Sequence, residues 1–225
     1  MTDPLEDFAR RAVGFEGRER IDAAAVEVMD ALREAHVGAL LLKGPVTASW
    51  LYARGEVRGY TDCDVLADPY RFASAGRVLR AAGFHLHGDE ATHPEVRDEG
   101  RTQIWHRVPG DVWIDLQWRL PGFERPPGEV WALLWARRET MTIASGRVTV
   151  ADESARALHL ATALDAGSAK ALSDLDRAIE RLESDVWERA ARLADDIGAR
   201  RALISGLSAV SGGPSLLARL QLSPE

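Results

Sequence analysis

Cysteine, lysine and long apolar runs are scarce in this chain, and each scarcity excludes a class of protein. Cys63 is the single cysteine, so no disulfide forms within the chain, as is usual for proteins of a reducing compartment. No apolar run approaches the roughly 20 residues that span a bilayer, and the first residues carry neither the basic nor the apolar segment of a signal peptide. A soluble, cytoplasmic protein without a membrane partner is therefore expected.

Positive charge is also in deficit, and almost all of it is arginine. Lysine and arginine together number 28 against 35 aspartates and glutamates, which gives a net charge of −7. Binding to long nucleic acid requires a basic face, so a long nucleic-acid partner is not expected. Lys43 and Lys170 are the only lysines. Lys43 follows an apolar run. A lysine at this position of an arginine-rich chain is notable, because an ammonium group is not equivalent to a guanidinium group.

The order of hydrophobic patterns predicts an α+β fold. With 225 residues, 46% of them apolar, the chain can bury one good core together with a helical appendage. Helices are predicted over 4–13, 18–35, 46–53, 69–82 and 129–137 and from 152 onward, strands over 37–42, 62–67, 84–87, 103–108 and 112–120, a loop over 88–100, and a hairpin over 141–150. This order divides the chain into N-terminal helices (1–36), a core of mixed sheet with flanking helices (37–125) and a mainly helical C-terminal domain (126–225).

Three aspartates stand in the predicted core strands. Asp62 and Asp64 are two residues apart at the start of an apolar run, so their side chains share one face of a strand. Asp115 lies in the apolar middle of another strand. Carboxylate oxygens bind hard divalent cations, and two-metal phosphoryl transfer uses acids that bridge two ions about 3.5–4 Å apart. The pattern therefore predicts a catalytic site in which all three aspartates bind two Mg²⁺ or Mn²⁺ ions.

Other interpretations of these acids stay open at this stage. An Asp-x-Asp pair also occurs as ordinary surface acids at the end of a strand. It serves metal-dependent glycosyltransferases as well, although that fold usually has a longer sheet before the motif. A non-catalytic protein of the same fold, such as an antitoxin-like or regulatory partner, is a third possibility, but it has no physical need to keep three like charges together.

Three segments carry a family resemblance: Leu-Leu-Leu-Lys43-Gly44, Arg58-x-x-Thr61-Asp62-x-Asp64, and Val112-x-x-Asp115-Leu-Gln-Trp118. Together they resemble the uncharacterised nucleotidyltransferases of the DNA polymerase β superfamily, over about residues 20–125 and weakly in the helical part. The resemblance implies a small polymerase-β-like core and an enzyme that depends on Mg²⁺. Such an enzyme moves a nucleoside monophosphate from a nucleoside triphosphate, such as ATP, to a hydroxyl or phosphate of a small molecule, peptide or protein.

The same resemblance implies nucleotide-binding roles for four residues. Lys43 and Gly44 would lie beside the triphosphate, where glycine permits close approach of the backbone and a following helix offers free N–H groups. Arg58 would neutralise triphosphate charge, and Thr61 would hydrogen-bond a phosphate or a carboxylate. The alternatives are a plain strand-to-helix turn with a solvated Lys43, a solvated Arg58 and a polar strand start at Thr61.

The remaining polar and aromatic residues of the core give weaker signals. Gln117 stands where relatives commonly have histidine, which puts any role of that histidine in doubt here. His85, His87, His93 and His106 make zinc conceivable, but no cysteine or carboxylate pattern of zinc spacing accompanies them. Trp105, Trp113 and Trp118 are interpreted as core or hairpin packing, with the lining of a substrate cleft as the alternative. Cys63 is expected to point into the core, away from the aspartates on either side of it.

Overall fold

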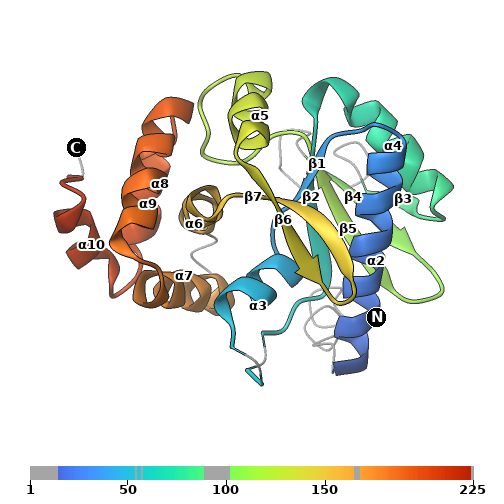
Figure 1. Ribbon diagram of the computed structural model, residues 1–225, viewed down its shortest axis with the longest axis horizontal. Coiled ribbons are helices and arrows are strands. Elements are labelled where there is room, and N and C mark those ends of the chain that lie inside the picture. The colour runs from blue at the N-terminus through green and yellow to red at the C-terminus, as the bar shows by residue number, and fades with distance from the viewer. Residues whose placement is uncertain (1–14, 54, 57, 89–101, 165–167, 224–225) are drawn as a thin grey trace. The chain divides into compact units, whose positions relative to one another are not determined.

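The computed structural model describes residues 15–53, 55–56, 58–88, 102–164 and 168–223, in which helices and strands are mixed (Figure 1). The predicted helix over 4–13, His93 and most of the predicted loop over 88–100 lie outside these ranges. The elements are α2 (Phe15–Glu34), β1 (Ala39–Leu41), α3 (Pro45–Leu51), β2 (Asp62–Ala67), a 3₁₀ turn η1 (Pro69–Arg71), α4 (Phe72–Ala81), β3 (His85–Gly88), β4 (Thr102–Arg107), β5 (Val112–Gln117), α5 (Pro127–Ala136), β6 (Arg138–Ile143), β7 (Gly146–Ala151), α6 (Glu153–Thr162), α7 (Ala169–Arg181), α8 (Ser184–Ile197), α9 (Arg200–Ser208) and α10 (Gly213–Arg219). The predicted α+β class is confirmed.

A five-stranded mixed sheet forms the centre of the first compact unit, which comprises residues 1–119 and 140–150. Its strand order is β1-β2-β5-β4-β3. β2 and β5 run parallel, whereas the other neighbouring strands are antiparallel. The two strands that carry the predicted acids are therefore direct neighbours in the middle of the sheet, although about fifty residues separate them along the chain.

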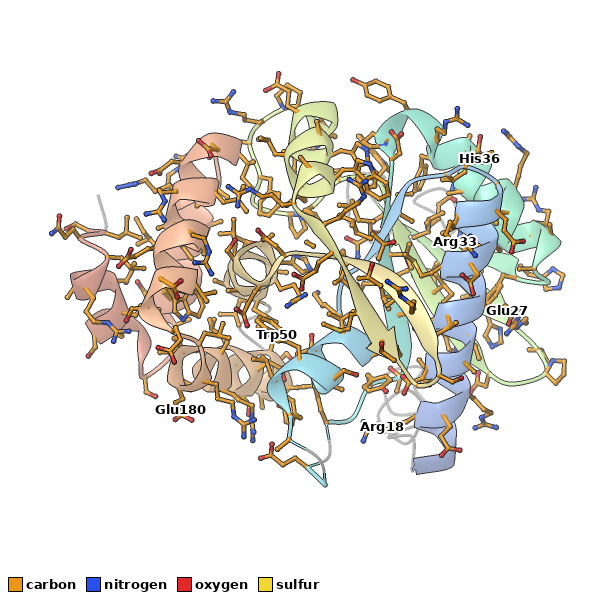
Figure 2. All side chains as sticks on the ribbon, viewed as in Figure 1. Arg18, Glu27, Arg33, His36, Trp50 and Glu180 are labelled. Carbon is orange, nitrogen blue, oxygen red and sulfur yellow. The ribbon has the colours of Figure 1, made fainter. Side chains whose placement is uncertain are left out.

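One face of this sheet is covered by helices. α2 packs against β1, β2, β5 and α4, and it does so through apolar side chains at helical spacing, among them Ile21, Val28 and Leu32. Figure 2 shows Arg18, Glu27 and Arg33 along α2, and Glu27 binds Arg107 at the end of β4, with 2.7 Å between Oε1 and Nη1. The helix is thus attached to the sheet by a buried apolar stripe and by an ion pair at its margin.

The β6–β7 hairpin also packs in this unit, against α2. A Cβ atom at Gly146 would lie 2.2 Å from Val26 Cγ1, and Ile143 and Val148 belong to the same buried core as α2. The predicted domain ranges 1–36, 37–125 and 126–225 differ from the compact units in the placement of α2 and of the hairpin, and in the start of the second unit at residue 120 instead of 126. The N-terminal helix α2 belongs to the sheet unit because its apolar stripe covers the sheet. The hairpin belongs to the same unit because it covers α2.

The second compact unit, residues 120–139 and 151–225, is mainly helical. α6 is its central helix: it contacts α7, α8 and α9, and its residues 154–161 are all buried. Asp152 caps α6 by accepting a hydrogen bond from the backbone N–H of Ala155 at 2.8 Å. A helix that is buried on all sides is typical of the interior of a bundle.

Within the described residues, no helix has both the length and the apolar content required to cross a membrane.

Candidate active site

The three predicted acids lie on one face of two neighbouring strands. The parallel register pairs Asp64 of β2 with Asp115 of β5, and Asp62 with Trp113. Because side chains alternate along a strand and paired residues share a face, all three aspartates project from the face opposite α2. The intervening residues Cys63 and Ile114 are fully buried under the helix. The sheet therefore has an apolar face and an acidic face, while the catalytic and metal-binding roles of the acids stay predictions.

Cys63 lies between the acids in sequence and on the opposite face in space, as expected. Its Sγ lies 3.8 Å from the carbonyl oxygen of Ile21 in α2. Burial raises the pKa of the thiol well above its ordinary value, and the negative charges of Asp62, Asp64, Asp22 and Asp115 raise it further. The thiol is therefore neutral and inert, and its raised pKa reflects the negative potential of the acidic face.

Asp64 is held by a side chain of the neighbouring strand. Gln117 of β5 donates a hydrogen bond from Nε2 to Asp64 Oδ1 at 2.9 Å, and both residues are only 9% exposed. Among the described residues, no group of three or more histidine, cysteine, aspartate or glutamate side chains is arranged to hold a metal ion. The oxygen donors on the acidic face suit Mg²⁺ by their chemistry, but their side chains are not assembled into a closed set of ligands.

The Lys43-Gly44 turn lies against the start of β2. Gly44 has φ +65°, and a Cβ atom there would lie 2.6 Å from the carbonyl oxygen of Asp62. Glycine is required for both reasons, since an L side chain is disfavoured at this φ and would overlap the strand backbone. Pro45 then begins α3, which has seven residues. The structure thus brings the turn beside Asp62, with Lys43 half-buried at its edge.

Arg58 is buried beneath this turn. It is 5% exposed, and its Nη1 donates a hydrogen bond to the carbonyl oxygen of Gly44 at 3.3 Å. The alternative of a solvated arginine is therefore wrong, because the side chain fixes the backbone of the turn. Thr61 is half-buried and immediately precedes β2. Contact of Arg58 and Thr61 with a nucleotide stays a prediction.

A network that sequence reasoning missed fixes the approach to β2. Tyr60, two residues before Asp62, is buried and donates a hydrogen bond to Asp22 of α2. The Arg18 guanidinium lies over the Tyr60 ring, 5.4 Å from its centroid. Burial, followed by the hydrogen bond to Asp22, raises the pKa of Tyr60 far above its ordinary value, so the phenol remains protonated. Tyr60 and Asp22 are 38 residues apart, and no local pattern predicts their contact.

An aromatic row continues the acidic face toward the edge of the sheet. The register aligns His85 of β3, His106 of β4, Trp113 of β5 and Asp62 of β2. The rings of His106 and Trp113 stack with centroids 4.0 Å apart, and Asp111 Oδ1 lies 3.1 Å from the indole nitrogen of Trp113. Among the tryptophans considered for the lining of a substrate cleft, Trp113 therefore lies on the acidic face.

Trp105 belongs to the other face of the sheet. It is 1% exposed, and a Cβ atom at Gly76 of α4 would lie 3.1 Å from its ring. The alternative that Trp105 lines a substrate cleft is therefore wrong, and its packing role is confirmed.

Three comparisons with known proteins bear on this fold and site. A model of an uncharacterised nucleotidyltransferase family matches residues 3–211. A comparison with curated proteins finds no match. Among solved structures, the antibiotic-resistance factor ANT(2'')-Ia has a TM-score of 0.50 at 14% identity, over 79% of this chain and 95% of that one.

Two further solved structures have lower scores. The lincosamide antibiotic adenylyltransferase LnuA has a TM-score of 0.44 at 10% identity, over 67% of this chain and 91% of that one. An antigenic nucleotidyltransferase-like protein from Paracoccidioides brasiliensis has 0.48 at 16% identity, over 85% and 94%. The structural similarity to ANT(2'')-Ia supports the fold, and the family match spans the sheet and most of the helical unit. The chain therefore belongs to this family of uncharacterised nucleotidyltransferases, as the sequence resemblance predicted.

Proposed function

We propose that this protein transfers a nucleoside monophosphate from a nucleoside triphosphate to a hydroxyl or phosphate group of an acceptor, in a reaction that depends on Mg²⁺ or Mn²⁺. The observation that carries the proposal is the register pairing of Asp64 with Asp115, with Asp62 on the same face and the Gly44 turn against it. The acceptor is a small molecule, a peptide or a protein. ATP is the first nucleotide to test.

In this proposal the three aspartates have different roles. Asp62 and Asp64 would hold both cations, and Asp115 would complete the metal site on the acceptor side. Bound Mg²⁺ supplies charge neutralisation on the triphosphate and acidifies an acceptor hydroxyl. The acceptor oxygen forms a bond to the α-phosphorus, the bond to the pyrophosphate oxygen breaks, and Asp115 takes the proton of the hydroxyl.

The turn after β1 would receive the phosphates. Lys43 acts as a point charge, and Gly44 lets the backbone approach the phosphate oxygens closely. Arg58 keeps the Gly44 carbonyl directed into the protein, so that the turn does not present that oxygen to an anion. Thr61 would contribute a hydroxyl at the start of β2.

A ligand panel tests this proposal against its rivals. Thermal unfolding would be followed with nucleoside triphosphates, nucleotide sugars, and Mg²⁺ or Mn²⁺, each alone and combined. Stabilisation by a triphosphate together with a metal supports nucleotidyl transfer, because only a ligand of the native state raises the melting temperature. A preference for nucleotide sugars would indicate a glycosyltransferase, and no response to any ligand would indicate a non-catalytic protein.

Substitution of each acid tests the assignment of residues. Asp62→Asn, Asp64→Asn and Asp115→Asn should each abolish pyrophosphate release from a triphosphate, while the melting temperature holds or rises because one like charge is removed. Asp30→Asn is the matched control, since Asp30 lies on α2 in a surface pair with Arg33. A variant of the three acids that keeps full activity with Mg²⁺ would contradict the role of that residue.

A further inference from the structure

The side chain of Gln117 connects the two acid-bearing strands. Its register partner on β2 is Leu66, and its amide reaches the diagonal neighbour, Asp64, with Nε2 2.9 Å from Oδ1. Both residues lie on the acidic face and are 9% exposed. A hydrogen bond between two side chains that are so little exposed is protected from competition by water, so it restricts the orientation of the carboxylate.

The chemistry of the donor matters because Asp64 is surrounded by like charges. Asp62 and Asp115 share its face. An amide holds the carboxylate in place without adding charge, whereas an ammonium or guanidinium group would neutralise the negative potential that a divalent cation needs.

We propose that Gln117 is a positioning residue for cation binding: its hydrogen bond to Oδ1 holds the Asp64 carboxylate in one orientation, so that contact with the cation falls on Oδ2. The inference rests on the proposed function, in which Asp64 is a metal ligand. Gln117 itself touches neither substrate nor metal. Partners of ligating carboxylates typically change metal affinity about 10–100-fold when they are removed.

The chain offers a matched control for the loss of this amide. Gln103 of β4 pairs with Leu116 and therefore lies on the opposite face, where its Oε1 is within 3.4 Å of a Cβ atom built at Gly76. Gln117→Leu and Gln103→Leu make the same change, the first on the acidic face of the sheet and the second on the opposite face. Gln117→His keeps an N–H donor near Asp64 and serves as the rescue variant.

The experiment is a calorimetric titration of the full chain with Mn²⁺ at pH 8, where imidazole is neutral, followed by a non-hydrolysable ATP analogue at saturating Mn²⁺. Gln117→Leu should weaken Mn²⁺ binding by about 10–100-fold and leave the affinity for the analogue at saturating Mn²⁺ unchanged. Gln103→Leu should bind Mn²⁺ as the original chain does, and Gln117→His should recover most of the lost affinity.

The outcomes separate the inference from the proposed function. Mn²⁺ affinity that is unchanged in Gln117→Leu, with or without a loss of stability, overturns the positioning role and leaves the proposed function standing. A failure of Gln117→His to recover affinity, in a variant with the melting temperature of the original chain, also counts against it. If the original chain binds no Mn²⁺ with or without the analogue, the proposed function is wrong and the role of Gln117 falls with it.

Discussion

The Arg58 guanidinium donates a hydrogen bond to the carbonyl oxygen of Gly44, from inside the protein and across fourteen residues of sequence. The bond joins the segment before β2 to the turn after β1, which are the two segments expected to face a nucleotide. It follows that the stability of the protein and the geometry of the turn both depend on a charged side chain.

Loss of Arg58 should therefore destabilise the fold. Hydrogen bonds that involve a charged group contribute about 1.5–3 kcal/mol, so Arg58→Met is expected to lower the free energy of unfolding by about that amount. Urea unfolding measures the change. Arg33→Met is the control, because Arg33 is 67% exposed and its surface pair with Asp30 is worth about 0–1 kcal/mol. Equal stability of the Arg58 and Arg33 variants would show that Arg58 does not hold the turn.

Gly44→Ala should damage the turn from the other side. The new methyl group would meet the carbonyl oxygen of Asp62 at 2.6 Å, and the residue would keep a φ of +65° that alanine disfavours. Strained backbone of this kind costs about 1–3 kcal/mol, and the clash adds to it. Gly59→Ala makes the same change at a glycine where the added Cβ atom would meet nothing within 4 Å. It should be close to neutral in the same unfolding assay. A neutral Gly44→Ala would mean that the turn can move away from β2.

Lys43→Ala should weaken triphosphate binding more than it weakens the fold. Lys43 is half-buried at the edge of the turn, where an ammonium group acts on phosphate mainly as a point charge. Titration with ATP in the presence of Mg²⁺ measures the effect, and an increase of about tenfold in Kd corresponds to 1.4 kcal/mol. Lys170→Ala, which removes the other lysine from an exposed position in the helical unit, should leave the Kd unchanged. If both variants bind ATP as the original chain does, Lys43 does not contact the nucleotide.

The Asp22 carboxyl predicts a specific pH dependence of stability. Burial raises its pKa above the ordinary value of 3.8, while the Tyr60 hydrogen bond and the Arg18 charge partly oppose the shift. Between the unfolded and the raised folded pKa, the native state binds more protons, so the contribution of Asp22 to stability is greatest in acid and falls as the pH rises through this window. Unfolding of the original chain and of Asp22→Asn, compared from pH 3 to pH 6, isolates the effect. The stability of the original chain relative to the variant should fall with rising pH, and a flat or rising difference would contradict the shift.

The acidic face shows what local sequence can predict and what it cannot. Strand alternation is local, so the shared face of Asp62 and Asp64 and the opposite direction of Cys63 follow from their spacing alone. The turn at Gly44 follows in the same way from an apolar run that ends in glycine and proline. Gln117 and Asp64 are 53 positions apart in sequence, and their contact depends on the parallel register of two strands, which no local pattern sets.

The burial of polar residues is a second feature that local sequence does not predict. An arginine between turn residues is usually solvated, yet Arg58 is buried and donates a hydrogen bond to the carbonyl oxygen of Gly44, fourteen residues away. Trp105 and Trp113 both stand in strands of alternating pattern, but the hairpin register sends Trp105 to the buried face and Trp113 to the acidic one. Which face a side chain takes is decided by pairing, which is a tertiary property.

The packing of Gly146 against Val26 also has a consequence for the order in which the chain can fold during synthesis. The sheet unit receives its last segment, residues 140–150, only after the chain has begun the helical unit at residue 120. A ribosome that has released the first 120 residues has therefore made all five sheet strands but not the hairpin that covers α2. The usual rule that an N-terminal domain folds first and alone therefore does not describe this chain, because Val26 of α2 packs against Gly146, which is made only after the helical unit has begun at residue 120.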